Sequence, residues 1–237
     1  MAGKNKQKVI ILLGSPGSGK GTQGELLSEK MNLYYFETSK ILEDKFTRKE
    51  TSGKNWIKID GKTYHFKKEK ELWENGLLCS PPFVTFLVME KIKELFKAGK
   101  SLILSGSPRT LYEGERLVPF LKKFYKRENI EVILLEQSAE TSIFRNSHRR
   151  ICRLMRHPIL YAKETARLKK CPIDGSELMK RKGLDNPETI KVRLKEYRER
   201  TFPLIELFKK KKLRMKRING EKPPADVFRD ILKALKN

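Results

Sequence analysis

The sequence has few cysteines and no long apolar run. Three cysteines among 237 residues are too few, and an odd number, for the disulfide framework of a small secreted domain. No apolar segment approaches the ~20 residues needed to span a bilayer. The basic N-terminus leads into apolar residues 9–13, a run too short for a signal-peptide core. Cys79 lies in an apolar stretch and is expected to be a small core residue. The absence of a disulfide framework, a membrane span and a signal peptide predicts a cytoplasmic protein outside membranes.

Acidic residues are also scarce relative to basic ones. Lys and Arg number 53 and Asp and Glu 29, so the formal net charge is +24. This excess favours polyanionic ligands, which include nucleic acids and free nucleotides alike. The densest basic run, Lys209 to Lys212, is typical of a solvated helix end and strand edge. Charge alone therefore does not select a ligand.

Apolar runs alternate with helical patterns along most of the chain. The runs predict strands at residues 9–13, 33–36, 101–104, 132–135 and 213–218. The helical patterns predict helices at about 19–31, 83–98, 113–124, 187–210 and 224–235. This alternation indicates an α/β fold with a parallel sheet covered by helices on both faces.

Two segments depart from the alternation. Residues 51–66 contain Asp60-Gly61 between alternating residues, which predicts a β-hairpin. Residues 149–185 have no convincing helical period and carry two cysteines. We expect both segments to be excursions from the core rather than independent domains.

A glycine-rich loop joins the first predicted strand to the first predicted helix. It reads Gly14-Ser15-Pro16-Gly17-Ser18-Gly19-Lys20, and this spacing between strand and helix is typical of loops that bind nucleoside triphosphates. Backbone N–H groups, the helix N-terminus and the lysine would hold the phosphates. The generic motif continues with Ser or Thr, but this chain has Gly21 and then Thr22, which weakens the expectation of a hydroxyl ligand to Mg²⁺.

Residues 14–23, Gly-x-Pro-Gly-x-Gly-Lys-Gly-Thr-Gln, resemble the adenylate kinases. Further motifs follow in the order of that family: Ser-Gly-Ser-Pro-Arg-Thr at 105–110, Arg145 with Arg149-Arg150, Thr189 to Ile205, and Gly-Glu-Lys-Pro at 220–223. The resemblance covers nearly the whole chain. It implies a P-loop kinase core at 1–37, 77–144 and 188–237, a monophosphate-binding insert with the hairpin at 38–76, and a lid at 145–187.

The resemblance also implies an activity and its residues. A phosphotransferase of this kind moves the terminal phosphoryl group of ATP to AMP, with Mg²⁺ accompanying ATP, and works as a cytoplasmic monomer. The implied catalytic residues are Lys20, Arg109, Arg149, Lys182 and Arg193. The implied ATP-binding residues are Gly14, Pro16, Gly17, Ser18, Gly19, Lys20, Gly21, Thr22, Arg145, Arg149 and Lys222. The implied acceptor-binding residues are Thr38, Lys40, Cys79, Gly106, Arg109, Glu113 and Arg193.

Several family positions are changed, mostly on the acceptor side. Ser105 replaces an aspartate that organises Mg²⁺ and its waters, and Glu43 stands where an arginine is expected. Glu113 replaces a glutamine that reads adenine, and the lid motif Arg-x-Asp-Asp reads Lys-Gly-Leu-Asp at 182–185. A glutamate cannot donate to N1 of adenine, but it can accept from N1–H and the amino group of guanine. GMP is therefore an alternative acceptor to AMP.

The predicted lid contains a partial zinc motif. Lids of this family often carry ligands spaced Cys-x-x-Cys and Cys-x-x-Asp. Here Met155 takes the second position, and His157, two residues later, could supply the missing ligand. The candidate set is Cys152, His157, Cys171 and Asp174. A metal-free lid is the alternative, while a Cys152–Cys171 disulfide is disfavoured in a reducing cytosol.

Two other classes of function compete with the kinase. A nucleotide-dependent accessory protein could bind RNA through the basic surface, although the sequence contains no recognisable RNA-binding module. A simple P-loop ATPase is disfavoured because Ser105 removes the carboxylate expected near Mg²⁺ and water. We rank the nucleoside monophosphate kinase first.

Overall fold

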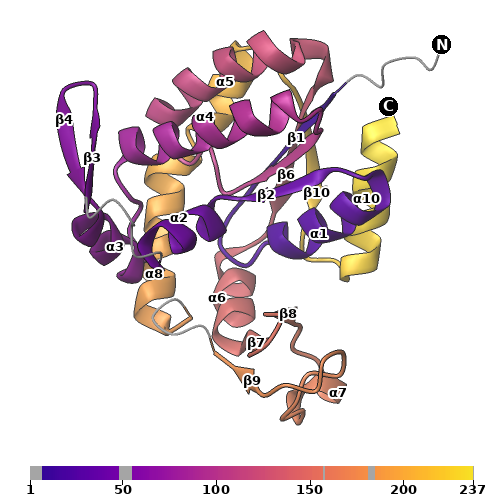
Figure 1. Ribbon diagram of the computed structural model, residues 1–237. Helices are drawn as coiled ribbons and strands as arrows, with labels where there is room; N and C mark the ends of the chain where they lie inside the picture. Colours follow the sequence, from indigo (N-terminus) through magenta and orange to yellow (C-terminus); the bar gives the residue numbers. More distant parts are fainter. Residues whose placement is uncertain (1–6, 48–54, 157, 181–184, 237) are drawn as a thin grey trace.

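A five-stranded parallel sheet forms the centre of the molecule (Figure 1). The computed structural model describes residues 7–47, 55–156, 158–180 and 185–236. Within it, the strands have the order β10-β6-β1-β5-β2, and every neighbouring pair is parallel. Their bounds are β1 (Val9–Gly14), β2 (Tyr34–Glu37), β5 (Leu102–Ser105), β6 (Ile130–Glu136) and β10 (Arg214–Asn219).

The central strands are apolar on both faces, as a covered parallel sheet requires. Every residue of β1 is buried. Val9, Ile11 and Leu13 pack into the larger hydrophobic cluster on one face, whereas Ile10 and Leu12 belong to the cluster on the other face. The strand therefore separates two cores.

Helices cover both faces (Figure 1). The larger cluster receives side chains from α4 (Pro81–Lys97), α5 (Leu111–Tyr125) and α9 (Leu204–Lys210). The smaller cluster receives them from α1 (Lys20–Met31) and α10 (Pro224–Lys236). The predicted α/β fold, with helices on both faces of a parallel sheet, is confirmed. In the part of the chain that is described, we find no helix that combines the length and apolarity needed to cross a bilayer.

The first excursion contains the predicted hairpin. It comprises α2 (Thr38–Thr47), β3 (Trp56–Ile59), β4 (Lys62–His65) and α3 (Phe66–Glu74). Strands β3 and β4 pair antiparallel, and both Asp60 (φ 48°) and Gly61 (φ 80°) have positive φ, as a tight hairpin turn requires. The prediction from Asp-Gly is therefore confirmed.

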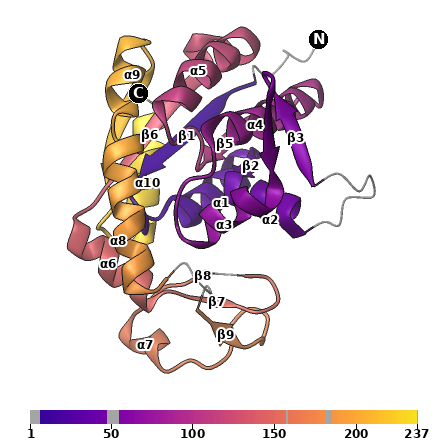
Figure 2. The same ribbon diagram turned by 90° about the vertical axis from the view of Figure 1, so that its left-hand side faces the viewer.

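The second excursion forms a small lobe below the main sheet (Figure 2). It follows α6 (Ala139–His148) and precedes α8 (Pro187–Glu196). The lobe contains a three-stranded antiparallel sheet of order β8-β7-β9 and one short helix. Its elements are β7 (Arg150–Cys152), β8 (Pro158–Ile159), α7 (Lys163–Ala166) and β9 (Leu178–Met179).

The prediction of one continuous helix over residues 187–210 was wrong. Helix α8 ends at Glu196, a wider turn, η2 (Tyr197–Thr201), follows, and α9 starts at Leu204. Pro203 explains the interruption, because proline has no amide hydrogen and its ring collides with the preceding helical turn. The amide of Phe202 bonds the carbonyl of Tyr197 instead (2.8 Å), which is the five-residue spacing of a π-turn.

Candidate active site

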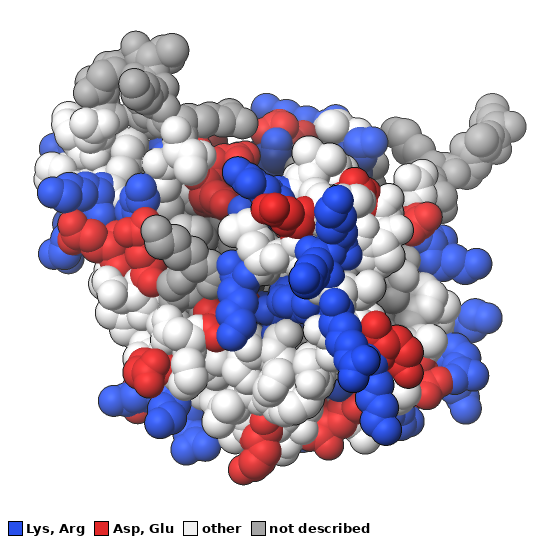
Figure 3. All heavy atoms as spheres, turned by 90° about the horizontal axis from the view of Figure 1, so that it is seen from below, with Lys and Arg blue, Asp and Glu red and all other residues white. Residues whose placement is uncertain are grey.

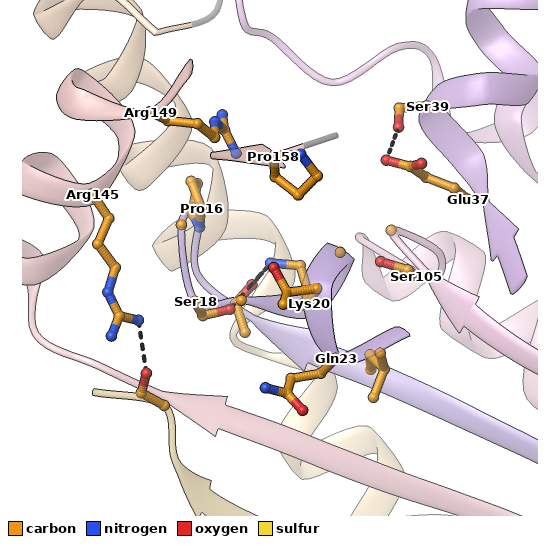
Figure 4. A pocket seen from close by; sticks show the side chains of 18 of the residues that line it. Pro16, Ser18, Lys20, Gln23, Glu37, Ser39, Ser105, Arg145, Arg149 and Pro158 are labelled. Atoms are coloured by element: carbon orange, nitrogen blue, oxygen red, sulfur yellow. Dashed lines mark hydrogen bonds between the residues drawn. The ribbon is translucent and has the colours of Figure 1, made fainter. Parts of the chain in front are cut away.

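A cleft of about 1270 Å³ lies at the carboxyl ends of the sheet strands. The phosphate loop, both excursions and the turn after β10 line it (Figure 4). Seen from the lobe side, basic side chains gather in the middle of this face (Figure 3). Ligands of open α/β sheets bind at this edge, beyond the carboxyl ends of the strands.

Glycine is required in the phosphate loop by close backbone packing. A Cβ at Gly14 would lie 2.5 Å from Ser18 Oγ and 2.6 Å from the carbonyl oxygen of Leu135. A Cβ at Gly17, whose φ is +79°, would lie 2.5 Å from Asn146 Nδ2. The loop therefore keeps its curvature only without side chains at these positions.

Lys20 lies at the centre of the loop. Its Nζ donates to the carbonyl oxygens of Gly14 (2.7 Å) and Ser15 (2.8 Å). Burial lowers the pKa of Lys20 well below its usual value, and the nearby charges of Arg109, Arg193 and Arg149 lower it further. Four cations from different segments thus line one cleft, an arrangement that a bound polyphosphate would stabilise.

Asp185 holds two of these arginines. Its side chain is only 1% exposed, and its carboxylate accepts a hydrogen bond from Arg149 Nε at 3.2 Å. Arg193 Nη1 lies 3.8 Å from the same carboxylate. Arg149 follows the end of α6 and Arg193 belongs to α8, so Asp185 connects the two helices that flank the small lobe.

Arg145 is aimed at the turn after β10 (Figure 4). It donates to the carbonyl oxygens of Gly220 (2.7 Å) and Glu221 (3.0 Å), and burial lowers its pKa. Lys222, in the same turn, forms an ion pair with Asp230 at 2.7 Å. Arg145 and Lys222 both line the cleft.

Five of the predicted acceptor residues come together around a narrow cavity of about 20 Å³ beside the cleft: Thr38, Cys79, Gly106, Arg109 and Glu113. Lys40 lines the larger cleft instead, with its Nζ 3.5 Å from Glu37 Oε2. Cys79 is buried, and burial raises the pKa of its thiol to about 12.

Glu113 stabilises the loop that carries Arg109. Its carboxylate accepts from Ser107 Oγ (2.6 Å), the amide of Arg109 (3.2 Å) and Thr110 Oγ1 (3.2 Å). Thr110 in turn caps α5 by accepting from the Glu113 amide. Burial raises the pKa of Glu113 in spite of these bonds. Any base that Glu113 contacts must share a carboxylate that already accepts three hydrogen bonds.

Glu43 connects the two excursions. Arg156, from the small lobe, places its Nη1 3.0 Å from Glu43 Oε1 on α2. Both side chains line the cleft. The position where the family has an arginine therefore carries the acidic partner of an arginine from the other side of the cleft.

Gly106 is predicted to control the position of Arg109. A Cβ at residue 106, whose φ is +94°, would lie 2.8 Å from Arg109 Nη2. In Gly106→Ala we expect the KM for the acceptor monophosphate to rise about 10-fold, since a displaced guanidinium loses ~1.5 kcal/mol of charge-assisted bonding. Steady-state kinetics with ATP saturating measures this effect.

Gly99→Ala is the matched control for Gly106→Ala. Gly99 has a similar φ, +73°, and a Cβ there would contact nothing within 4 Å. It shares the backbone strain without the collision. Equal changes of KM in the two variants would show that strain, and not the position of Arg109, is responsible.

Three candidate metal ligands meet in the small lobe. The Sγ atoms of Cys152 and Cys171 and a carboxylate oxygen of Asp174 all lie within 4.8 Å of one another. Cys152 Sγ donates to Asp174 Oδ2 at 2.9 Å, and this bond is the main cause of a lowered pKa of Asp174. Gly175, with φ +71°, permits the tight turn behind the carboxylate. This donor set suits a tetrahedral Zn²⁺ that takes one further ligand.

Two predicted residues cannot be placed. His157 and Lys182 lie outside the described residues. Met155, which precedes His157, is described, and its side chain is 63% exposed.

Residues from the β6–α6 connection and from α6 hold the phosphate loop, and sequence reasoning missed them. Gln137 Nε2 donates to Ser15 Oγ (3.0 Å) and to the carbonyl oxygen of Pro16 (2.9 Å). Ser142 Oγ donates to the same carbonyl. One signal could have identified Gln137: it lies two residues past the strand predicted at 132–135, at the edge where such sheets bind ligands.

The fold and the site together define a P-loop phosphotransferase. A family model described as adenylate kinase matches residues 12–213. The chain belongs to the adenylate kinase family. The predicted resemblance and the predicted class of enzyme are confirmed, and the chain is a kinase of nucleoside monophosphates. Members of this family use ATP with Mg²⁺.

Curated relatives cover nearly the whole chain. The adenylate kinase of Caldicellulosiruptor bescii is 33% identical over 95% of this chain and 98% of its own length. The adenylate kinase of Acetivibrio thermocellus is 32% identical over 95% of this chain and 97% of its own. The adenylate kinase of Archaeoglobus fulgidus is 31% identical, with coverage of 94% and 95%.

Proposed function

We propose that the enzyme transfers the γ-phosphoryl group of ATP to AMP and forms two molecules of ADP. The observation that carries this proposal is that Arg109, Arg149 and Arg193 line the same cleft as Lys20, whose pKa is lowered by burial and then by these three charges. Phosphoryl transfer needs positioning and compensation of charge on the transferred group, and little covalent chemistry. A cluster of cations around a glycine loop supplies both.

Each side of the cleft has its own task in this proposal. The loop amides and Lys20 hold the β and γ phosphates. Arg145 donates to the turn that receives the adenine, and Lys222 belongs to that turn. Arg109 holds the phosphate of the acceptor through a two-pronged contact. Arg149 and Arg193, with Lys182 as a predicted addition, stabilise charge on the transferring group.

The proposed domains follow from these tasks. Residues 1–37, 77–144 and 188–237 form the core, 38–76 the acceptor insert and 145–187 the lid. The Arg156–Glu43 ion pair supports a lid that closes against the insert. Closure would exclude water, so that hydrolysis of ATP does not compete with transfer. The monomeric state and the cytoplasmic location stay predictions.

Mg²⁺ fits the site mainly through ATP itself. Thr22 and Ser105 line the cleft and offer neutral hydroxyl oxygens in place of a carboxylate. Bound Mg²⁺ would neutralise charge on the phosphates of ATP. The protein residues then orient the nucleotide around it.

The identity of the acceptor is tested by comparing monophosphates. We expect AMP to give the highest kcat/KM among AMP, GMP, CMP and UMP in a coupled assay with ATP. Equal inactivity with all four would refute the kinase. A preference for GMP that Glu113→Gln reverses would instead assign guanine recognition to Glu113.

We also propose that the lid holds a structural Zn²⁺. Cys152, Cys171 and Asp174 would bind it, with His157 as the fourth ligand. Purified protein is expected to contain about one equivalent of zinc, and a chelator is expected to lower the melting temperature, because binding of a structural metal contributes to folding. Cys171→Ser should lose the metal, whereas Cys79→Ala, which removes a distant thiol, should keep it.

The metal-free alternative has a clear signature. Less than half an equivalent of zinc, together with an unchanged melting temperature in chelator, would show that hydrogen bonds and packing hold the lid without metal. In that case the Cys152–Asp174 hydrogen bond is one of the interactions that stabilise the lobe, beside the packing of Ile159 and Leu178.

A further inference from the structure

The edge of the sheet opposite the active site is rich in basic residues. All five strands are parallel, so the segments that enter them lie together at this edge. Helices α4, α5 and α9 also end there, a few residues before β5, β6 and β10 begin. Of the cations in their last residues and in the entering segments, we call eight the basic edge: Lys97, Lys100, Lys123, Lys126, Arg127, Lys210, Lys211 and Lys212.

Contacts at the end of α5 bring the three segments of the basic edge together. Lys122 Nζ donates to the carbonyl oxygen of Lys211 at 2.6 Å, and Tyr125 Oη donates to that of Lys100 at 3.2 Å. Burial lowers the pKa of Lys122, and the charges of Arg127 and Lys211 lower it further. Figure 2 shows α5 and α9 side by side at the end of the molecule away from the lid.

The charges of the basic edge are not neutralised locally. Lys211 is half-buried and the other seven side chains are exposed. No ion pair found among the described residues includes any of the eight, although the exposed Glu128 lies in the same segment as Lys126 and Arg127. Two other nearby carboxylates have partners outside the eight. Glu206 pairs with Lys209 at 2.8 Å and Glu131 with Arg214 at 2.6 Å.

Helix dipoles account for only a small part of this charge. Lysines at helix C-termini are favourable because each terminus carries about half a negative elementary charge. Three helices end at the basic edge, so their dipoles offset about 1.5 charges in all. Glu128 adds one negative charge within these segments. Together the helix dipoles and Glu128 offset fewer than three of the eight positive charges, so most of these charges face solvent without a counter-charge from the described residues.

We propose that the basic edge binds the phosphate backbone of nucleic acid. From β10 to β5 there are three strand spacings of about 4.8 Å, so the edge extends about 14 Å along the sheet alone. Duplex nucleic acid carries a charge about every 1.7 Å, so that length covers several phosphates. Lysine is a point charge that contacts phosphate rather than base edges, and binding is therefore independent of sequence.

The composition of the basic edge favours a hydrophilic polyanion over a membrane. The large hydrophobic side chains that are exposed in the described residues include none from residues 97–101, 122–128 or 209–214. Peripheral membrane surfaces combine basic residues with apolar side chains that enter the headgroup region. Nucleic acid needs only the cations.

The test uses the full chain and a labelled 20-nucleotide RNA, with excess ATP to fill the cleft. The edge variant, Lys100→Gln with Lys123→Gln and Lys210→Gln, removes one cation from each entering segment. We expect its affinity, from fluorescence anisotropy, to fall at least about 10-fold at 0.1 M salt. The slope of log K against log salt should decrease by about 2, at about 0.7 per lost contact with a single strand.

A matched variant removes the same charge elsewhere. Lys58→Gln with Lys62→Gln and Lys67→Gln changes three exposed lysines of the hairpin and the start of α3. It should bind RNA like the wild type, whereas the edge variant should also keep wild-type kcat/KM with ATP and monophosphate, since none of its three positions belongs to the cleft. Retained activity shows that the edge variant folds, and the binding result does not depend on the proposed acceptor.

Three outcomes would overturn the basic edge as a nucleic-acid surface. Equal loss of RNA binding in the two triple variants would assign binding to overall charge. If the wild type does not bind RNA even at 50 mM salt, nucleic acid is ruled out as the ligand of the basic edge. Binding to vesicles that contain phosphatidylserine, without binding to RNA, would make the surface a membrane contact.

Discussion

Lys20→Met is expected to lower the rate of phosphoryl transfer about 1000-fold, because a preorganised cation beside developing phosphoryl charge contributes on this scale. Lys20 is the only lysine of the glycine loop, and burial together with the charges of three arginines that line the same cleft lowers its pKa. Methionine has a similar length and no charge. Single-turnover kinetics with saturating ATP distinguishes a slower transfer step from weaker binding of ATP.

The stability of Lys20→Met should move in the opposite direction to its activity. The folded state lowers the pKa of Lys20, so folding disfavours the charged form at pH 7. This unfavourable contribution is present below the lowered pKa and fades as pH rises through it towards the unfolded value. Removing the charge removes the contribution, and the melting temperature without nucleotide should equal or exceed that of wild type at pH 7.

Lys30→Met is the control for this prediction. Lys30 is exposed in the last turn of α1, the same helix that begins with Lys20. Lys30→Met should leave both the rate of phosphoryl transfer and the melting temperature unchanged. A Lys20→Met enzyme that keeps more than a tenth of wild-type activity would contradict the role assigned to the loop.

The elements predicted well are those whose signal is local. The strand at β1 follows from an unbroken apolar run, and the hairpin follows from Asp60-Gly61, because one residue pair determines the turn. Helices α2 and α6 were not predicted. Side chains from both are buried against distant segments, and those contacts are not visible in a local pattern. Pro203 carried the correct signal for the helix break, but the long helical pattern around it concealed that signal.

The site was predictable where a motif specifies it and not where long-range contacts do. The glycine loop and the arginines came from motifs and their order. Gln137 contacts Ser15 across more than 100 residues, and no local pattern records such a pair. Glu113 was expected to face a base, whereas its carboxylate bonds Ser107 and Thr110, which only the positions of the side chains reveal.

Asp185→Ala is expected to lower kcat about 100-fold and the free energy of unfolding by about 2 kcal/mol. The carboxylate is buried and accepts charged hydrogen bonds, each of which contributes about 1.5–3 kcal/mol. Without it, Arg149 and Arg193 lose their common partner and repel each other, so neither is held for transfer. Chemical denaturation and steady-state kinetics measure the two effects.

Glu206→Ala provides the comparison for an exposed ion pair. Glu206 pairs with Lys209 at 2.8 Å, and its side chain is 75% exposed. Such pairs contribute about 0–1 kcal/mol, so neither stability nor rate should change measurably. If Asp185→Ala and Glu206→Ala lose similar amounts of stability and rate, then the burial of Asp185 and its two arginine contacts contribute no more than an exposed ion pair.

A double-mutant cycle decides whether Asp185 acts through Arg149. If the carboxylate serves to position that guanidinium, then Arg149→Ala already removes what Asp185 contributes through it. Adding Asp185→Ala should then lower kcat by much less than the 100-fold expected in the wild-type background. Full additivity would instead give Asp185 a contribution independent of Arg149, with Arg193 as the partner that the structure places next to it.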